Sequence, residues 1–326
     1  MTKTFIELCA GGGGLSTGLI KCGFNPILLN DNNADCCKTL KHNHVEANVI
    51  CASMLDIDYT KYKNVDLLTA GVPCQSFSQI GKQKGLDDPR GDLMMKFIDI
   101  IKIINPKVFM IENVKGLLSH DNGNTLRTII NALNDDNLYN INYKCLDASK
   151  FNVPQKRERV FIIGSLKNIN RNYIFPKELE TTKVLKDVLY NVPISKGAKY
   201  NDKKIELFKM IPQGGCWINL PEKLQKDYLG KSFYSGGGKR GILHRLSMEK
   251  PCLTLLCSPS QKQTERCHPL ENRPLTIREY ARIQTFDDDY EFIGSLNSQY
   301  KQIGNAIPVE LAFHIGKSIM QFLNNN

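Results

Sequence analysis

The chain has 326 residues with 41% hydrophobic content, enough for a large core, and a formal net charge of +10. It shows neither an apolar stretch as long as a membrane span nor a signal-peptide pattern, so we expect no membrane association. Its 11 cysteines are odd in number and lack Cys-x-x-Cys spacing, which argues against disulfides or a metal site and favours the reducing cytoplasm.

Strand and helix patterns alternate through the first half of the chain. Strands are predicted at residues 5–8, 26–30, 49–52, 66–70, 107–111 and 159–164, and helices at 15–22, 34–43, 93–104 and 125–133. Gly23 follows the first of these helices at the position of a C-cap. This alternation predicts an α/β fold with a doubly wound, mostly parallel sheet.

The regular pattern stops between about residues 167 and 270, where Gly, Pro, Lys and Asn are frequent. The segment holds the only tryptophan, Trp217, and apolar runs such as 253–257, so we predict a small, loop-rich domain instead of disorder. It contains 19 Lys/Arg and 9 Asp/Glu, a net charge of +10. Such a basic segment indicates a polyanion-binding surface, although a solvated lysine-rich surface has the same composition. Helical patterning returns at 275–284 and 308–322.

Cys74 lies on the loop after an apolar run at 65–70 that reads as a buried strand. Gly71 and Pro73 end that strand. Ligand sites in open α/β sheets form at the carboxyl ends of strands, and a thiolate there can act as a nucleophile. The alternative is a small buried structural cysteine. The other polar motifs of the chain favour the nucleophile.

A glycine loop at 9–14 joins the first predicted strand to the first predicted helix. Glycines allow a tight turn and the close approach of a ligand to the helix N-terminus. Asp31 follows about twenty residues later at the end of the second strand, where a carboxylate can accept hydrogen bonds from ribose hydroxyls. The pair predicts a site for an adenosine-bearing cofactor, with a flexible loop as the alternative.

Two further polar motifs belong to the same predicted sheet. Glu112-Asn113-Val114 follows the strand at 107–111 and brings a carboxyl to the edge that carries Cys74. Gln155-Lys156-Arg157-Glu158-Arg159 precedes the strand at 159–164 and supplies cations that can lower a thiol pKa or bind phosphate. A helix-capping acid and a charged turn are the respective alternatives.

Six motifs occur in a fixed order. They are the glycine loop, Pro73-Cys74-Gln75, Glu112-Asn113-Val114, the Gln-x-Arg-x-Arg pattern at 155–159, residues 273–282 and the run 302–307. This order resembles the bacterial DNA (cytosine-5)-methyltransferase family over the whole chain except 167–270, the family's variable target-recognition region. The resemblance implies a Rossmann-like, S-adenosylmethionine-dependent methyltransferase sheet with a small irregular target-recognition domain.

The resemblance also implies catalytic roles. Cys74 would attack carbon 6 of a cytosine flipped out of double-stranded DNA, and Glu112 would contact the ring nitrogen at position 3. Arg159, with Arg157 close by, would help bind the base and its adduct. The expected DNA contacts are Gln75, Ser78, Lys239 and Arg240.

The cofactor contacts of the family map onto Cys9, Ala10, Gly11, Gly12, Asp31, Asn32, Pro73, Leu93, Asn305 and Ala306. Cys9 stands where the family usually has Phe, which makes one wall of the S-adenosylmethionine site smaller. An acidic residue expected after the third strand appears as Ser53, with Asp56 or Asp58 as alternatives, so the adenine contact stays open.

We therefore predict a monomeric cytoplasmic enzyme of a bacterial restriction-modification system. Residues 1–170 plus 305–326 would form the catalytic and cofactor-binding domain, and 171–304 the DNA target-recognition domain. One alternative is a tRNA cytosine-5 methyltransferase, although its Cys-Phe-Thr element is not found here. A second is a catalytically silent DNA-binding homologue, which the joint presence of Cys74, Glu112 and Arg159 disfavours.

Overall fold

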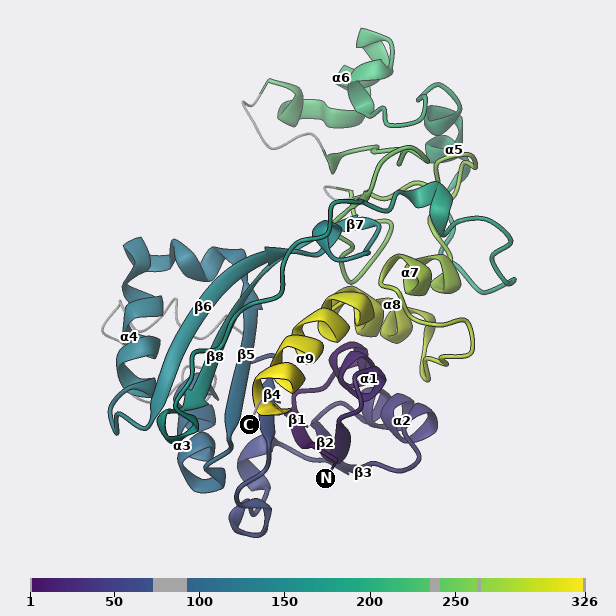
Figure 1. Ribbon diagram of the computed structural model, residues 1–326. Coiled ribbons are helices and arrows are strands. Elements are labelled where there is room, and N and C mark those ends of the chain that lie inside the picture. The colour runs from purple at the N-terminus through teal and green to yellow at the C-terminus, as the bar shows by residue number, and fades with distance from the viewer. Residues whose placement is uncertain (1, 73–92, 235–240, 263–264, 325–326) are drawn as a thin grey trace.

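A seven-stranded sheet forms the centre of the molecule. The structure, a computed structural model, describes residues 2–72, 93–234, 241–262 and 265–324. The sheet has the strand order β3-β2-β1-β4-β5-β8-β6 (Figure 1). Its strands are β1 (Thr4–Leu8), β2 (Asn25–Asp31), β3 (Asn48–Cys51), β4 (Leu67–Ala70), β5 (Val108–Val114), β6 (Tyr139–Asp147) and β8 (Glu158–Leu166). The first five in chain order are parallel to one another, which confirms the predicted mostly parallel α/β sheet.

Helices cover both faces of this sheet (Figure 1). On one face, α3 (Leu93–Ile104) and α4 (Asn124–Leu133) share a core with Ile6 and Leu8 of β1. On the other face, α1 (Gly14–Lys21) and α9 (Val309–Asn324) share a core with Phe5. Successive side chains of a strand point to opposite faces, so β1 contributes to both cores.

Two helices have the predicted bounds, and the local reasons are clear. α2 (Ala34–Asn43) begins where the Asn33 side chain accepts hydrogen bonds from the backbone N–H groups of Asp35 and Cys36. α3 buries an apolar stripe at helical spacing that includes Phe97, Ile101 and Ile104. In each case residues close in sequence determine the element.

The far edge of the sheet differs from the prediction. β6 was not expected, because most of its residues are only partly buried and it contains no apolar run. β8 was predicted, but it is antiparallel to both β5 and β6. Glu112–Val114 are the last residues of β5 and do not follow it. The carboxyl of Glu112 therefore projects from a paired strand.

The variable segment folds into a small unit with its own core in the described residues. It contains α5 (Asp202–Lys209) and α6 (Glu222–Leu229), and its core includes Phe208, Leu220 and Leu243. Trp217 is partly buried against that core. A two-stranded parallel sheet, β7 (Gln155–Lys156) and β9 (Cys252–Leu253), links this part of the chain to the segment just before β8. The predicted small, loop-rich unit is confirmed for these residues.

Two helices precede α9 and share a core of their own, whereas most of the buried side chains of α9 pack into a core beside the main sheet. α7 (Ile277–Ile283) begins with a capping box in which Thr276 and Glu279 bond each other's backbone N–H groups. α8 (Leu296–Asn305), which was not predicted, leads into α9. None of the helices in the described ranges is long and apolar enough to cross a membrane.

Candidate active site

Glu112 lies beside the point where β4 leads into the segment that carries Cys74. A Cβ atom built on Gly71 would lie 3.5 Å from Glu112 Oε2. The neighbouring Asn113 donates from Nδ2 to the carbonyl of Val72 over 3.1 Å. These two contacts fix the chain just before residue 73 against the end of β5. The structure thus brings Glu112 close to the start of the Pro-Cys-Gln motif.

Arg159 holds the Glu112 carboxyl from the neighbouring strand. Arg159 pairs with Val114 in the register of β8 and β5, and its Nε lies 2.9 Å from Glu112 Oε1. Both side chains are largely buried. Burial raises the pKa of Glu112 above its usual value, even though Arg159 and Arg157 act in the opposite direction. The site therefore combines a carboxyl of raised pKa with an adjacent cation.

Arg157 has a different environment from Arg159. It is 2% exposed and donates from Nη1 to the carbonyl of Leu255 and from Nη2 to that of Asn305, over 3.2 and 3.3 Å. Burial lowers the pKa of Arg157 to about 9, with a further contribution from the charge of Arg159. Arg157 consequently ties three parts of the chain together beneath the site, and the catalytic role that the resemblance implies for it stays a prediction.

The glycine loop forms an open cradle at the ends of β1 and β2. Cys9 and Gly11 adopt positive φ values of 55° and 56°, which turn the chain sharply after β1. Asp31 Oδ2 accepts a hydrogen bond from Gly11 N over 2.8 Å, and Asp31 Oδ1 accepts one from Asn33 N over 2.8 Å. The carboxylate thus orders both loops, and it stays partly exposed at the edge of the cradle.

Only one of the four glycines faces open space. A Cβ atom on Gly11 would meet nothing within 4 Å. In contrast, a Cβ on Gly12 would lie 3.0 Å from Gln302 Cβ, and one on Gly14 would overlap the carbonyl oxygen of Ile307. Protein packing therefore excludes a side chain at Gly14 and leaves little space for one at Gly12, whereas Gly11 leaves room for a ligand. This cradle fits the adenosyl cofactor that the sequence predicts.

The remaining predicted cofactor residues that the structure describes lie at or near the ends of β1, β2, β3 and α8 and at the start of α3. Asn305 ends α8, and the buried Ala306 follows it. Ser53 caps a short 3-10 helix after β3 by accepting from Leu55 N, and Leu93 is the first residue of α3. Asp56 and Asp58 are exposed, and Asp58 Oδ1 accepts a hydrogen bond from the Thr60 hydroxyl. Asn32 is exposed between β2 and α2. Ala10, which donates to Asn30, lies at the base of the cradle.

Cys9 is predicted to form one wall of the S-adenosylmethionine site, where the family usually has Phe. Its Sγ lies 3.9 Å from Met54 Sδ, and burial raises the pKa of its thiol to about 12. Cys9 is therefore a neutral, mostly apolar wall.

Six predicted site residues lie outside the described part of the chain: Pro73, Cys74, Gln75, Ser78, Lys239 and Arg240.

Sequence reasoning did not identify a buried amide pair behind the site. Gln155 donates from Nε2 to Gln284 Oε1 over 2.8 Å and accepts from Leu255 N over 2.9 Å. Gln284 in turn donates to the carbonyls of Ile303 and Ala306. Gln155 could have been singled out from the sequence, because it is the first residue of the Gln-x-Arg-x-Arg pattern. Nothing local in the sequence indicated Gln284.

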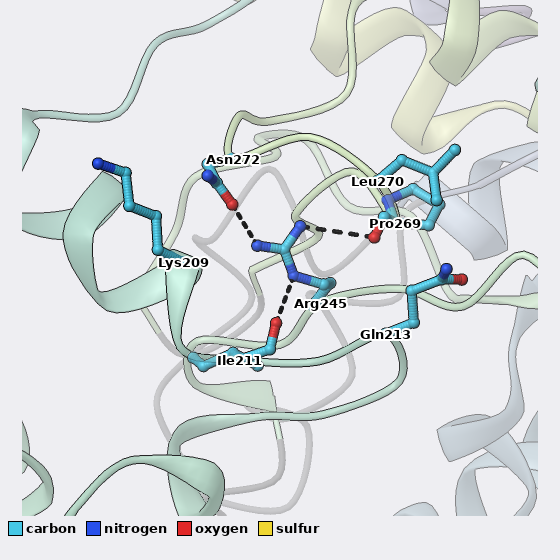
Figure 2. A pocket seen from close by; sticks show the side chains of 7 residues that line it. All are labelled: Lys209, Ile211, Gln213, Arg245, Pro269, Leu270 and Asn272. Atoms are coloured by element: carbon cyan, nitrogen blue, oxygen red, sulfur yellow. Dashed lines mark hydrogen bonds between the residues drawn. The ribbon is translucent and has the colours of Figure 1, made fainter.

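A separate pocket of about 330 Å³ lies in the variable segment (Figure 2). Arg245 crosses it and bonds the carbonyls of Ile211 and His268 as well as the side chain of Asn272. Arg245 thereby holds two loops of the small unit together. The pocket is lined by Lys209, Ile211, Gln213, Arg245, Pro269, Leu270 and Asn272. None of these residues was predicted to belong to the functional site. Within the described ranges, no group of three or more His, Cys, Asp or Glu side chains is arranged to hold a metal ion.

Comparison with solved structures supports the fold. A putative DNA modification methyltransferase encoded in an Escherichia coli prophage superposes with a TM-score of 0.73 at 24% identity, over 99% of this chain and 100% of that one. The Entamoeba histolytica methyltransferase EhMeth superposes with a TM-score of 0.70 at 17% identity, over the full length of both chains. At these identities the likeness concerns the fold alone, and it confirms the Rossmann-like methyltransferase architecture.

Sequence comparison identifies the family. The chain is 48% identical over 331 residues to Type II methyltransferase M.Eco47II of Escherichia coli, covering 98% of this chain and 79% of that one. It is 46% identical over 330 residues to M.Sau96I of Staphylococcus aureus, covering 98% and 76%. The family model for C-5 cytosine-specific DNA methylase matches residues 3–321. The chain therefore belongs to the C-5 cytosine-specific DNA methylases, and DNA cytosine is favoured over the tRNA alternative.

Proposed function

We propose that this DNA (cytosine-5)-methyltransferase uses S-adenosylmethionine, works through a covalent Cys74 adduct and is the modification enzyme of a restriction-modification system. The observation that carries the catalytic part is the Glu112 carboxyl, paired with Arg159 and placed next to Gly71, three residues before Cys74. The names of the relatives, Type II methyltransferases, support the biological role.

The cradle at the ends of β1 and β2 is the proposed cofactor site. Gly11 leaves open space for the ligand, and Asp31 presents its carboxylate at the rim. Asn305 and Ala306 approach from the end of α8. When bound, S-adenosylmethionine supplies an electrophilic methyl group. We propose that Pro73, Leu93, Cys9, Ala10, Gly12, Asn32 and Ser53 complete the walls of this site.

Catalysis must activate carbon 5 of cytosine, which is a poor nucleophile. We propose that the Cys74 thiolate bonds to carbon 6 while ring nitrogen 3 accepts a proton from Glu112, whose raised pKa favours its protonated form. Carbon 5 then takes the methyl group. A base removes the proton from carbon 5, the sulfur–carbon 6 bond breaks to release the thiolate, and ring nitrogen 3 returns its proton to Glu112. Arg159 keeps the carboxyl of Glu112 directed at the ring during these steps.

The target cytosine must be flipped out of the DNA duplex, because the enzyme cannot reach a base that is paired and stacked. We propose that residues 171–304 read the duplex and that residues 1–170 with 305–326 perform the transfer. The net charge of +10 on 167–270 supports a phosphate-binding role for this segment. Gln75, Ser78, Lys239 and Arg240 are the proposed DNA contacts. We further propose that the enzyme acts as a cytoplasmic monomer.

The test compares wild type with Cys74→Ser, using radiolabelled S-adenosylmethionine and either duplex DNA or tRNA. Wild type should methylate the duplex only, and the serine variant should transfer no methyl group because its hydroxyl provides almost no anion at neutral pH. Duplex containing 5-fluorocytosine should trap a denaturation-resistant adduct with wild type alone. Wild-type activity of the serine variant would refute the covalent mechanism, and an inert wild-type protein that binds DNA would indicate the silent homologue.

A further inference from the structure

Two hydroxyl groups hold the carbonyls of the glycine loop from behind. Tyr290 Oη donates to the carbonyl of Gly12 over 2.8 Å, and Thr17 Oγ1 donates to the carbonyl of Gly13 over 2.6 Å. Tyr290 is 278 residues away from Gly12 in the sequence. Its hydroxyl packs so closely that a Cβ atom on Gly13 would overlap it. The third glycine of the run is thus required by Tyr290.

These bonds fix the orientation of the peptide groups in the loop. The peptide between Gly12 and Gly13 is held at both ends, by Tyr290 at its carbonyl and by the carbonyl of Ala10 at its N–H, over 3.0 Å. The peptide between Ala10 and Gly11 is also held at both ends, by Gly13 N and by Asp31 Oδ2. The Gly11–Gly12 peptide lies between these two fixed peptides and borders the open space at Gly11.

His44 completes the arrangement. Its Nε2 lies 3.4 Å from both Thr17 Oγ1 and Tyr290 Oη. Each hydroxyl has a single proton, which it donates to a carbonyl, so Nε2 must carry a hydrogen and donate to the two hydroxyl oxygens. Burial lowers the pKa of His44 to about 4, so this imidazole is neutral near pH 7. The three side chains form one buried hydrogen-bonded cluster.

Tyr290 is itself held in place by neighbouring elements. Arg278 of α7 donates to the carbonyl of Tyr290 over 2.9 Å. The next residue, Glu291, exchanges two hydrogen bonds with the Asn43 side chain at the end of α2, over 2.7 and 2.9 Å. The Tyr290 hydroxyl is therefore a fixed support and not a freely rotating side chain.

We propose that Tyr290 and Thr17 are positioning residues for the methyl donor, because their hydroxyls set the glycine-loop peptides in the conformation that receives the cofactor. Neither hydroxyl touches the cofactor in this arrangement; both act through the carbonyls of Gly12 and Gly13. The inference rests on the proposed use of S-adenosylmethionine.

The test measures the affinity of purified protein for S-adenosylmethionine and S-adenosylhomocysteine by calorimetry. Tyr290→Phe should raise both dissociation constants about five- to tenfold, the effect of losing one buried hydrogen bond. It should raise KM for S-adenosylmethionine with little change in kcat. Tyr139→Phe is the matched control, since Tyr139 is also buried and donates to a backbone carbonyl, that of Pro106, at the far edge of the sheet. Tyr139→Phe should leave cofactor affinity unchanged.

Thr17 provides an independent variant pair, which also serves if Tyr290→Phe does not fold. Thr17→Val keeps the shape and removes the donor, so it should weaken cofactor binding, and Thr17→Ser should restore it. Wild-type affinity in Thr17→Val, or equal losses in Tyr290→Phe and Tyr139→Phe, would overturn the inference. Failure of the wild-type protein to bind S-adenosylmethionine would instead refute the proposed cofactor.

Discussion

Glu112 Oε1 and Arg159 Nε lie 2.9 Å apart across the antiparallel strands β5 and β8. The pairing depends on the antiparallel direction of β8, because this direction places Arg159 opposite Val114, two residues beyond Glu112. A cation held against a buried carboxyl keeps the carboxyl oriented while burial keeps its pKa high.

Glu112→Gln should slow methyl transfer by about 10²- to 10⁴-fold, because an amide cannot supply the proton that the base needs during attack. Cofactor affinity should change little. Single-turnover rates with a cognate duplex measure the effect. Glu158→Gln is the control, since Glu158 lies beside Arg159 on β8 but pairs with Lys115 at the surface. A rate within about threefold of wild type, roughly 0.65 kcal/mol in barrier, would make Glu112 merely structural.

Arg157 and Arg159 should respond differently to replacement by Met. Arg157→Met leaves the carbonyls of Leu255 and Asn305 without their donors, so the free energy of unfolding should fall by about 1–3 kcal/mol for each group left unsatisfied. Arg159→Met should reduce the transfer rate with a smaller loss of stability. Urea denaturation and single-turnover kinetics on both variants measure the two effects. Equal stability losses would contradict the distinction.

Gly14→Ala and Gly11→Ala should affect different properties. The first should mainly reduce stability, and the second should mainly reduce cofactor affinity. Gly14→Ala should destabilise the protein, because the new Cβ overlaps the backbone oxygen of Ile307, which cannot move independently. Gly11→Ala meets open space, but its φ of +56° costs about 1 kcal/mol for a residue with a side chain. We expect Gly11→Ala to lose cofactor affinity with only that modest loss of stability, as thermal unfolding with and without S-adenosylhomocysteine would show.

Glu7→Gln should stabilise the protein, and more so at high pH. Burial raises the pKa of Glu7 to about 8, well above its ordinary value of 4.5. The folded state therefore retains a proton that the unfolded state releases, and its stability falls as the pH rises from about 4.5 through 8. The gain of the variant over wild type should be about 3.5 kcal/mol larger at pH 8 than at pH 5. The exposed Glu46→Gln is the control and should show no such trend.

Residues 167–270 should transfer sequence specificity. A chimera that carries this segment in a related methyltransferase of different specificity should methylate the site recognised by this chain. The segment holds the excess positive charge and its own core, so it can be exchanged as a unit. Bisulfite sequencing of host DNA identifies the methylated site. An active chimera that kept the recipient's target would show that the reader lies elsewhere.

Elements set by nearby residues could be predicted from the sequence. α2 and α3 have the expected bounds because a capping side chain and an apolar stripe define them locally. β6 was missed because an edge strand with mostly half-exposed residues carries no apolar signal. The direction of β8 was also hidden, since a strand pattern contains no information on pairing direction.

The candidate site, like the fold, could be predicted only where the signal is local in the sequence. Glu112 and Arg159 were predicted together, and the structure places them in contact. The burial of Arg157 could not be predicted, because Leu255 and Asn305, which enclose it, lie about 100 and 150 residues away in the sequence. Tyr290 carries no local signal for the same reason.

The packing of α1 on α9 joins elements from opposite ends of the described chain. A Cβ atom on Gly18 would overlap Ala312, and one on Gly14 would overlap Ile307. The ribosome synthesises α1 long before α9. The apolar face of α1, the helix that follows the glycine loop, therefore stays exposed until α9 has been made. Such long-range contacts form late and slowly in folding. The glycine loop should therefore reach its final conformation only after α9 has been synthesised, and arrested chains that lack α9 should depend on chaperones.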